Sequence, residues 1–260
     1  MSDTQTSSLK RIRIRGSELV TPLIQKIGYQ YMTDFPSIEL ILSKASSMHG
    51  YKSIFHGTVD IGMVSRGMPD ELLRQIQDKN TEYKHTLIAH DALAIIVHPS
   101  NPIKNLKPSD LKRIFSGRAR DWQEFGWNDG GKIALYSPHP SQQSFATWRL
   151  LVMGENYPVT IESNTMLDGR QLTQAVENNR QAIAYLSWVP AHTADSTILR
   201  IDDRYPSSET ISKKQYLLSQ ELQLFSKSDV SDHVQRFLDY CTSPNTGQAI
   251  IRDMGWLSLG

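Results

Sequence analysis

The sequence predicts an α/β fold with two lobes, and three observations support this prediction. Strand-like and helix-like segments alternate over residues 11–99, and a second set of the same kind follows. The 260 residues, 39% of them hydrophobic, are enough for two domains of medium size. Hydroxyl-rich helix starts follow strands in both sets, which is the layout of a protein that binds a ligand in a cleft. We place the first lobe at residues 1–94 plus 192–260 and the second at 95–191.

The first set opens with RIRIR at residues 11–15, which alternates with period two as a half-buried strand does. Residues 16–32 then change to helical spacing, with Leu23 and Tyr31 among the apolar side chains on one face. The elements expected next, in order, are a strand at 38–43, a helix at 50–57, a buried strand at 59–65, a helix at 70–77 and a strand, or two strands with a bend, at 85–99.

The second set opens with a helix at 107–117, in which we expect Ser109 to be the N-cap and Gly117 to end the helix. A further helix at 141–154 is expected to have Ser141 at its cap. The other elements expected are strands at 132–137, 181–188 and 215–226 and helices at 169–179, 232–243 and 245–255.

The composition argues against several classes of protein. The net charge of +1 gives no reason to expect nucleic acid or an acidic membrane surface as a partner. Cys241 is the only cysteine, so the chain has no intrachain disulfide and no cysteine-based metal cluster. No apolar run approaches the roughly 20 residues that span a bilayer, and the start MSDTQTSSLKRIRIRG lacks the apolar region of a secretory signal. We expect a cytoplasmic protein, or a periplasmic or cell-surface protein whose signal peptide was removed.

Four strand-to-helix loops are candidates for ligand binding, because open α/β sheets bind ligands at the carboxyl ends of their strands. In the first loop, Ser17 and the N–H groups after it can hold a ligand oxygen. The alternative is a plain helix N-cap at Ser17 with Glu18 in the first turn. In the second loop, Ser46 and Ser47 allow the same two interpretations. We expect His49 there to lie at the helix start rather than to bind a metal.

The third loop places Arg66 after Ser65 at the end of a strand, where a guanidinium can bind an oxyanion through two hydrogen bonds. The alternative is a surface ion pair of Arg66 with Asp70 or Glu71. The fourth loop is SPHPSQQSFATWR at residues 137–149, whose start carries hydroxyl and amide groups and whose arginine lies about two helical turns inward. This loop either lines a binding cleft or only caps a helix.

Motifs of known enzyme classes are missing from the sequence. It contains no GxSxG elbow, no GxxxxGK[ST] phosphate loop, no HExxH and no GxGxxG. The segment DWQEFGWNDGG carries three carboxylates, but their spacing does not mark a paired-carboxylate site. We therefore predict a non-catalytic protein with no metal and no cofactor.

Five stretches together resemble the phosphate-binding proteins that feed ABC importers, within the type 2 periplasmic-binding-protein superfamily. GSELVTPL resembles GSTTVxPL, and GYKSIFHGTVDIGMVSRGMPDEL resembles GxxALxxGxxDIGxxSRxxxxEE. HDALAIIVHPSNPIKNLKPSDLKRIFSGRARDW is similar to DxxAVIVNPxNPVxxLTxxQLxxIFSGxxxxW. QAIAYLSW stands where the family has GAIGYVS, and FLDYCTSPNTGQAIIRDMGWLSL where it has FxxFxxSPEGQxIVxxxGYxPL. The stretches occur in the family's order from Ile12 to Leu259.

The resemblance implies the type 2 periplasmic-binding-protein fold, with a ligand cleft between two lobes that close by hinge motion. It also implies a small polar ligand, phosphate or another oxyanion among the possibilities, and the membrane subunits of an ABC importer as partner. We expect a monomer. The ligand-binding residues it implies are Ser17, Glu18, Leu19, Ser46, Ser47, Ser65, Arg66, Ser137, Ser141, Gln142 and Gln143.

Three of the four loops depart from the family pattern in ways that bear on the ligand. The second loop, SSMHG at residues 46–50, keeps Ser47 as a donor but has lost most of the glycines of a GSGxG-like stretch, which let the backbone approach a ligand. Glu18 replaces a second hydroxyl group, and a carboxylate within about 4 Å of a dianion costs several kcal/mol unless it is protonated or paired. In the fourth loop, alignment on Ser141 puts Ser137 where the family has an arginine. Such a pocket suits a neutral or zwitterionic ligand at least as well as phosphate.

Two alternatives to a solute-binding protein remain open at this point. One is a diverged sensory or protein-interaction module of the same fold that does not bind phosphate. The other is an enzyme that uses Glu18 or His49 as a base.

Overall fold

The computed structural model describes residues 9–77, 81–154, 160 and 162–259, and the chain divides into two compact units. Unit 1 comprises Met1–His90 and Gln220–Gly260, and unit 2 comprises Asp91–Ser219. Two strands run from one unit into the other, namely β4 (Tyr83–Val97) and β11 (Ser219–Lys227).

The return of the chain to unit 1 lies later than the position expected from the sequence, which was residue 192. Residues 192–219 stay in unit 2 because they contain two short strands that pair there. β9 (Thr197–Ile198) is antiparallel to β4, and β10 (Arg200–Ile201) is parallel to β5 (Asn105–Leu106). Two-residue strands carry too little periodicity to be recognised in a sequence.

Unit 1 is built on a sheet in the order β2-β1-β3-β11-β4. β1 (Lys10–Ser17) is parallel to β2 (Ile38–Ala45) and to β3 (Ile61–Val64), while β11 is antiparallel to β3. The carboxyl ends of β1, β2 and β3 therefore lie along one edge of this sheet. The helices of the unit are α1 (Thr21–Asp34), α2 (Ser47–Phe55), α3 (Asp70–Gln77), α9 (Asp232–Thr242) and α10 (Gly247–Asp253).

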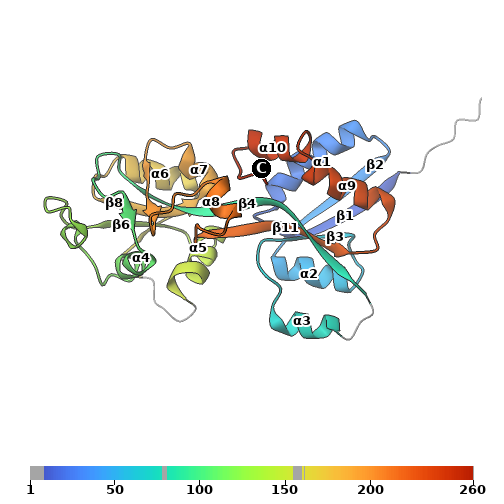
Figure 1. Ribbon diagram of the computed structural model, residues 1–260, viewed down its shortest axis with the longest axis horizontal. Coiled ribbons are helices and arrows are strands. Elements are labelled where there is room, and N and C mark those ends of the chain that lie inside the picture. The colour runs from blue at the N-terminus through green and yellow to red at the C-terminus, as the bar shows by residue number, and fades with distance from the viewer. Residues whose placement is uncertain (1–8, 78–80, 155–159, 161, 260) are drawn as a thin grey trace, which may run out of the picture. The chain divides into compact units, whose positions relative to one another are not determined.

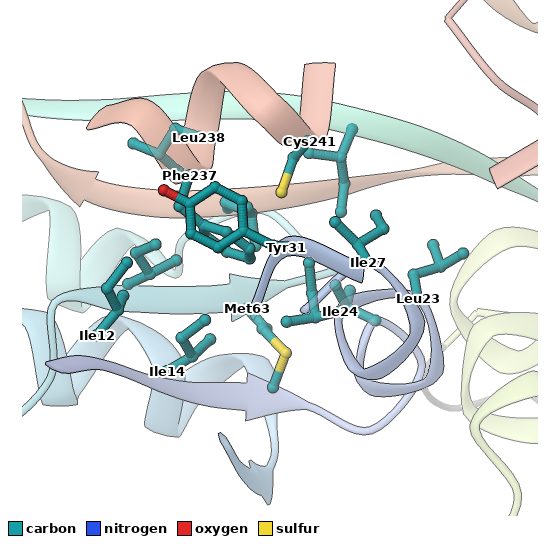
Figure 2. Close-up of a cluster of buried hydrophobic side chains, with 14 of the residues drawn as sticks. Ile12, Ile14, Leu23, Ile24, Ile27, Tyr31, Met63, Phe237, Leu238 and Cys241 are labelled. Atoms are coloured by element: carbon teal, nitrogen blue, oxygen red, sulfur yellow. The ribbon is translucent and has the colours of Figure 1, made fainter. Parts of the chain in front are cut away.

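Helices cover both faces of the unit 1 sheet, with α1, α9 and α10 on one face and α2 and α3 on the other (Figure 1). The first face holds the larger core, in which side chains of β1 and α1 meet those of α9 (Figure 2). Ile12 and Ile14 point into this core because the period of a strand sends alternate residues to the same face. Cys241 is fully buried there, and burial raises the pKa of its thiol.

Unit 2 is built on the carboxyl half of β4, followed in order by β8, β6 and β7. β8 (Ala182–Ser187) is antiparallel to β4 and parallel to β6 (Ala134–Pro138), which is parallel to β7 (Asn164–Met166). Three carboxyl ends again meet at one edge. The helices are α4 (Pro108–Phe115), η1 (Trp122–Phe125), α5 (Gln143–Trp148), η2 (Arg149–Met153), α6 (Gly169–Glu177), α7 (Trp188–His192) and α8 (Ser208–Ser212).

Alternate residues of β8 pack against the two faces of the unit 2 sheet. Ala184 and Leu186 contact the core beneath α6, because alternate residues of a strand point to the same face of its sheet. On the other face Tyr185 stacks on Trp148 with ring centroids 4.1 Å apart, and Phe115 meets Tyr185 edge to face. This aromatic packing fixes α4 and α5 on the sheet.

Two helix caps differ from the sequence-based expectation. α4 begins two residues earlier than Ser109 allows, with Lys107 as N-cap and the Asp110 carboxylate accepting the Lys107 N–H at 3.0 Å. Pro108 causes this, because proline is favoured at the first position of a helix. α5 has Gln142 rather than Ser141 as its N-cap. Gly117, at φ +76°, follows the end of α4 as expected.

Candidate ligand-binding site

Three serines meet at the carboxyl edge of the parallel strands in unit 1. Ser17 is the last residue of β1, Ser47 is the first residue of α2 after β2, and Ser65 follows β3. The Ser65 hydroxyl lies 2.9 Å from that of Ser17 and 3.3 Å from that of Ser47, and the Ser65 N–H donates to Ser47 Oγ at 3.0 Å. We call these residues the three-serine cluster. It joins three neighbouring strands through side chains that the sequence places 18 and 48 residues apart.

The close approach of β1 to β3 creates this cluster. Gly16 has φ +147°, and a Cβ atom at this position would lie 2.1 Å from the Met63 carbonyl oxygen. Only glycine fits here, both because of the backbone conformation and because of the neighbouring strand. Gly16 thereby lets Ser17 reach Ser65.

The structure rules out one of the two interpretations of Ser17, the helix N-cap. α1 begins at Thr21 with no side chain bonding to its first N–H groups, so Ser17 is not its N-cap. The residues between them form a turn, in which the Ser17 carbonyl accepts from the Val20 N–H and from the Thr21 hydroxyl. The Ser17 side chain, 2% exposed, is therefore committed to the three-serine cluster.

In the second loop Ser46 and Ser47 make different contacts. Ser46 is the N-cap of α2 and accepts from the His49 N–H, and its hydroxyl lies 2.9 Å from His49 Nδ1. The expectation that His49 lies at a helix start is thus confirmed. Ser47 is half-buried and belongs to the three-serine cluster instead.

Both charged residues predicted in unit 1 are exposed at this edge. The Glu18 backbone N–H donates to the Ala45 carbonyl at 3.1 Å. Arg66 follows Ser65, and its carbonyl accepts from the Tyr51 hydroxyl at 2.9 Å. Among the ion pairs of the described residues none involves Arg66, so the expected alternative of a pair with Asp70 or Glu71 is not found. Its guanidinium is available to an oxyanion.

Leu19 and Tyr51 anchor this edge to the cores below. The Leu19 side chain is half-buried and packs against the larger core of unit 1. Tyr51 is fully buried, and burial raises the pKa of its hydroxyl to about 12. The hydroxyl therefore stays protonated at neutral pH and keeps the Arg66 backbone in place.

In unit 2 the predicted residues that the structure describes contact different partners. Ser137 lies in β6, is 1% exposed, and accepts from the Ser163 hydroxyl at 2.9 Å. Ser141 is exposed, and both its hydroxyl and its N–H contact His139 Nδ1, at 2.8 and 3.2 Å. Gln142 is exposed and donates to the Leu167 carbonyl at 2.6 Å. The side chain of Gln143 lies outside the described part of the chain.

The loop of unit 2 contains no fixed positive charge. Residues 137–148 include neither lysine nor arginine, and Ser137 is held by another serine. An anion at this loop would therefore depend on hydroxyl, amide and backbone N–H groups alone.

A cavity of about 120 Å³ opens where β6, β7 and β8 end, and sequence reasoning missed it. Gln142 is the one predicted site residue that lines it. The residues that line the cavity are Pro138, Gln142, Ser144, Met166, Asp168, Gly169, Leu172, Leu186, Ser187 and Pro190. Three of the lining residues, Gln142, Asp168 and Ser187, are the N-caps of α5, α6 and α7. Helix starts after neighbouring strands are the signal by which such a cavity could be predicted from the sequence.

Within the described residues, no set of three or more histidine, cysteine, aspartate or glutamate side chains is arranged to hold a metal ion. The same part of the chain contains no helix that is both long and apolar enough to cross a membrane.

Comparison with known proteins identifies relatives along nearly the whole chain. A family model described as "PBP superfamily domain" matches residues 2–245. A phosphate-binding protein PstS of Staphylococcus haemolyticus is 28% identical over 222 residues, which are 82% of this chain and 69% of that protein. Its counterpart in Staphylococcus aureus strain USA300 is 26% identical over 81% of this chain and 66% of its own length. The chain thus spans about two thirds of the length of these curated relatives.

Solved structures resemble this one in fold. An ABC-type phosphate transport receptor from Vibrio cholerae has a TM-score of 0.85 at 23% identity, over 95% of this chain and 99% of that one. A putative phosphate ABC transporter substrate-binding protein with bound phosphate from Clostridium perfringens has a TM-score of 0.72 at 24% identity, over 96% and 100%. The predicted α/β periplasmic-binding-protein fold is confirmed. The names of these proteins describe binding proteins and a receptor, in agreement with the prediction that this chain is not an enzyme.

Proposed function

The chain belongs to the PBP superfamily, and from this membership we propose that it is a solute-binding protein of an ABC importer. In this proposal it binds phosphate or another small polar ligand that carries an oxyanion. Its partners are the membrane subunits of the importer, and its place is the periplasm or the cell surface.

The observation that carries the proposal is the three-serine cluster with Arg66 beside it. Hydroxyl groups from three adjacent strand ends converge at the edge where open α/β sheets bind ligands. Arg66 follows one of them, and its guanidinium is exposed with no ion pair to a described residue. Guanidinium groups bind oxyanions through two parallel hydrogen bonds.

The contribution of unit 2 is proposed to be hydrogen bonding without charge. Ser137, Ser141, Gln142 and Gln143 offer hydroxyl and amide groups, and the sequence between them supplies no cation. Among the predicted site residues, only Arg66 of unit 1 carries a fixed positive charge.

Calorimetric titration with inorganic phosphate tests the proposal. We expect Arg66→Ala to weaken binding by at least about tenfold, because a charge-assisted pair is worth about 1.5–3 kcal/mol. Arg66→Lys should retain part of the affinity, since lysine keeps the charge without the two-pronged geometry. Arg74→Ala is the matched control, as it removes an exposed arginine of α3 whose Nε donates to the Asp70 carbonyl at 3.4 Å.

Equal affinity in the wild type and in Arg66→Ala would overturn the assignment of Arg66. Absence of any heat with millimolar phosphate, together with absence of a thermal shift across a panel of small oxyanions, would favour the sensory or protein-interaction module over a solute-binding protein.

A further inference from the structure

A cavity of about 290 Å³ lies in unit 1, at the sheet edge opposite the three-serine cluster. The cluster lies at the carboxyl ends of three parallel strands, whereas the cavity is lined by Val59 and Asp60, which precede β3. β11 is antiparallel to β3, with Phe225 opposite Gly62, so the end of β11 also lies at this edge. The end of α2 and the start of α9 complete the walls. The cavity is therefore separate from the proposed oxyanion site.

The floor of this cavity is apolar and is held by the cores on both faces of the unit 1 sheet. Ile54 is 2% exposed and belongs to the core beneath α2, and Val234 is 3% exposed and belongs to the larger core. Val59 and Val230 are half-buried beside them, each packed against one of the two cores. Because packing fixes these side chains, the cavity exists before a ligand arrives, and an aliphatic group placed in it is removed from water.

Two charged side chains at the rim of the cavity remain available to a ligand. Lys227 and Asp229 are exposed, and among the residues that the structure describes neither takes part in an ion pair or a side-chain hydrogen bond. Asp60 also lines the cavity, but its carboxylate accepts three hydrogen bonds from Arg13. The charges left for a ligand are therefore one cation and one anion, two residues apart in the chain.

We propose that this cavity binds a small zwitterion with an aliphatic tail, such as an apolar α-amino acid. Its carboxylate pairs with Lys227, its ammonium pairs with Asp229, and its tail lies on the apolar floor. A ligand with a single charge would leave one of the two rim charges without a partner. A volume of 290 Å³ holds about nine or ten non-hydrogen atoms at roughly 30 Å³ each, which is the size of leucine. This site lies within unit 1 and goes beyond the proposed function, on which it does not depend.

Three probes with the same branched tail separate the two charges. L-leucine carries both charges, 4-methylpentanoate lacks the amine, and 3-methylbutylamine lacks the carboxylate. In calorimetric titration at millimolar concentrations, we expect the wild-type protein to bind leucine about threefold more tightly than either analogue, since exposed ion pairs contribute little more than this. Glycine keeps both charges without the tail and should bind more weakly than leucine, because it leaves the apolar floor in water.

Two substitutions at the rim should have opposite effects on the two analogues. We expect Lys227→Met to weaken the binding of leucine and 4-methylpentanoate about threefold and to leave 3-methylbutylamine unaffected. Asp229→Asn should weaken leucine and 3-methylbutylamine to a similar extent and leave 4-methylpentanoate unaffected. Lys26→Met and Asp253→Asn are the matched controls, because they remove exposed charges of α1 and α10 that do not line the cavity.

The outcomes separate this inference from the proposed function. Absence of saturable leucine binding to the wild-type protein, equal affinities for leucine and its two analogues, or an affinity for leucine that survives either rim substitution would overturn the zwitterion site. Titration of the same proteins with inorganic phosphate reports on Arg66 alone. We expect the affinity for phosphate to be the same in the wild type, Lys227→Met and Asp229→Asn, so either site can fail without the other.

Discussion

Ser17 and Ser65 of unit 1 and Ser141 of unit 2 lie at or after the ends of strands and are held in opposite ways. In unit 1, Ser17 and Ser65 are buried and bind each other across two strands. In unit 2, Ser141 is exposed and binds back to His139, two residues earlier. The first arrangement depends on the assembled sheet, whereas the second needs only a turn.

The turn formed by His139 and Ser141 occurs a second time in unit 2. His98 and Ser100 at the end of β4 repeat the pattern His-Pro-Ser, and the Ser100 hydroxyl and N–H lie 2.8 and 3.1 Å from His98 Nδ1. The two turns share one geometry although they follow different strands. The hydrogen bonds of Ser141 are therefore those of a turn that His-Pro-Ser forms at two places in this chain. The three-serine cluster, in contrast, requires three strands to be assembled.

The largest expected effect comes from Gly16→Ala, which would break the unit 1 arrangement outright. The new methyl group overlaps the Met63 carbonyl, so β1 and β3 must separate. We expect a loss of about 3–5 kcal/mol in the free energy of unfolding, measured by urea denaturation. Gly57→Ala is the control, with φ +66° and no atom within 4 Å, and should cost only about 1–2 kcal/mol. Similar losses in both variants would contradict the close approach.

A smaller effect is expected from Ser65→Ala, which sharpens the contrast between the two units. The change leaves the buried Ser17 hydroxyl without its partner, and we expect a loss of about 1–3 kcal/mol in unfolding free energy. The equivalent change in unit 2, Ser141→Ala, should cost at most about 0.5 kcal/mol because its turn is exposed. If Ser141→Ala proved the more damaging of the two, the contrast would be wrong.

The smallest effect concerns the other end of the β1–β3 pair, where Asp60 accepts from the Arg13 backbone N–H at 2.7 Å and from its guanidinium at 3.0 and 3.2 Å. Burial raises the pKa of Asp60, but these hydrogen bonds outweigh it and the pKa lies below its usual value. The stabilisation is present above about pH 4 and is lost as the pH falls through the lowered pKa.

We expect Asp60→Asn to cost about 1 kcal/mol at pH 7, since the pair is partly exposed. The difference from the wild type should shrink in urea denaturation below pH 4. A difference that grows with acidity would contradict the sign of this pKa shift.

Regular elements were predicted well from the sequence because their periodicity is local. RIRIR lies in β1, and the spacing of Leu23 and Tyr31 predicts the face of α1 that enters the core. The three-serine cluster was predicted only as separate loops, since hydrogen bonds over 18 and 48 residues leave no local pattern. The alternative of an N-cap at Ser17 could not be excluded from the sequence, because a serine before a helical segment looks the same whether or not it caps the helix.

Cys241 has a practical consequence. Its thiol is shielded inside the unit 1 core, and its raised pKa keeps the reactive thiolate scarce. Fluorophores attached through maleimide to one engineered cysteine on each unit should therefore carry no background from the native side chain. Energy transfer between such dyes would then test, one molecule at a time, whether a ligand changes the separation of the units.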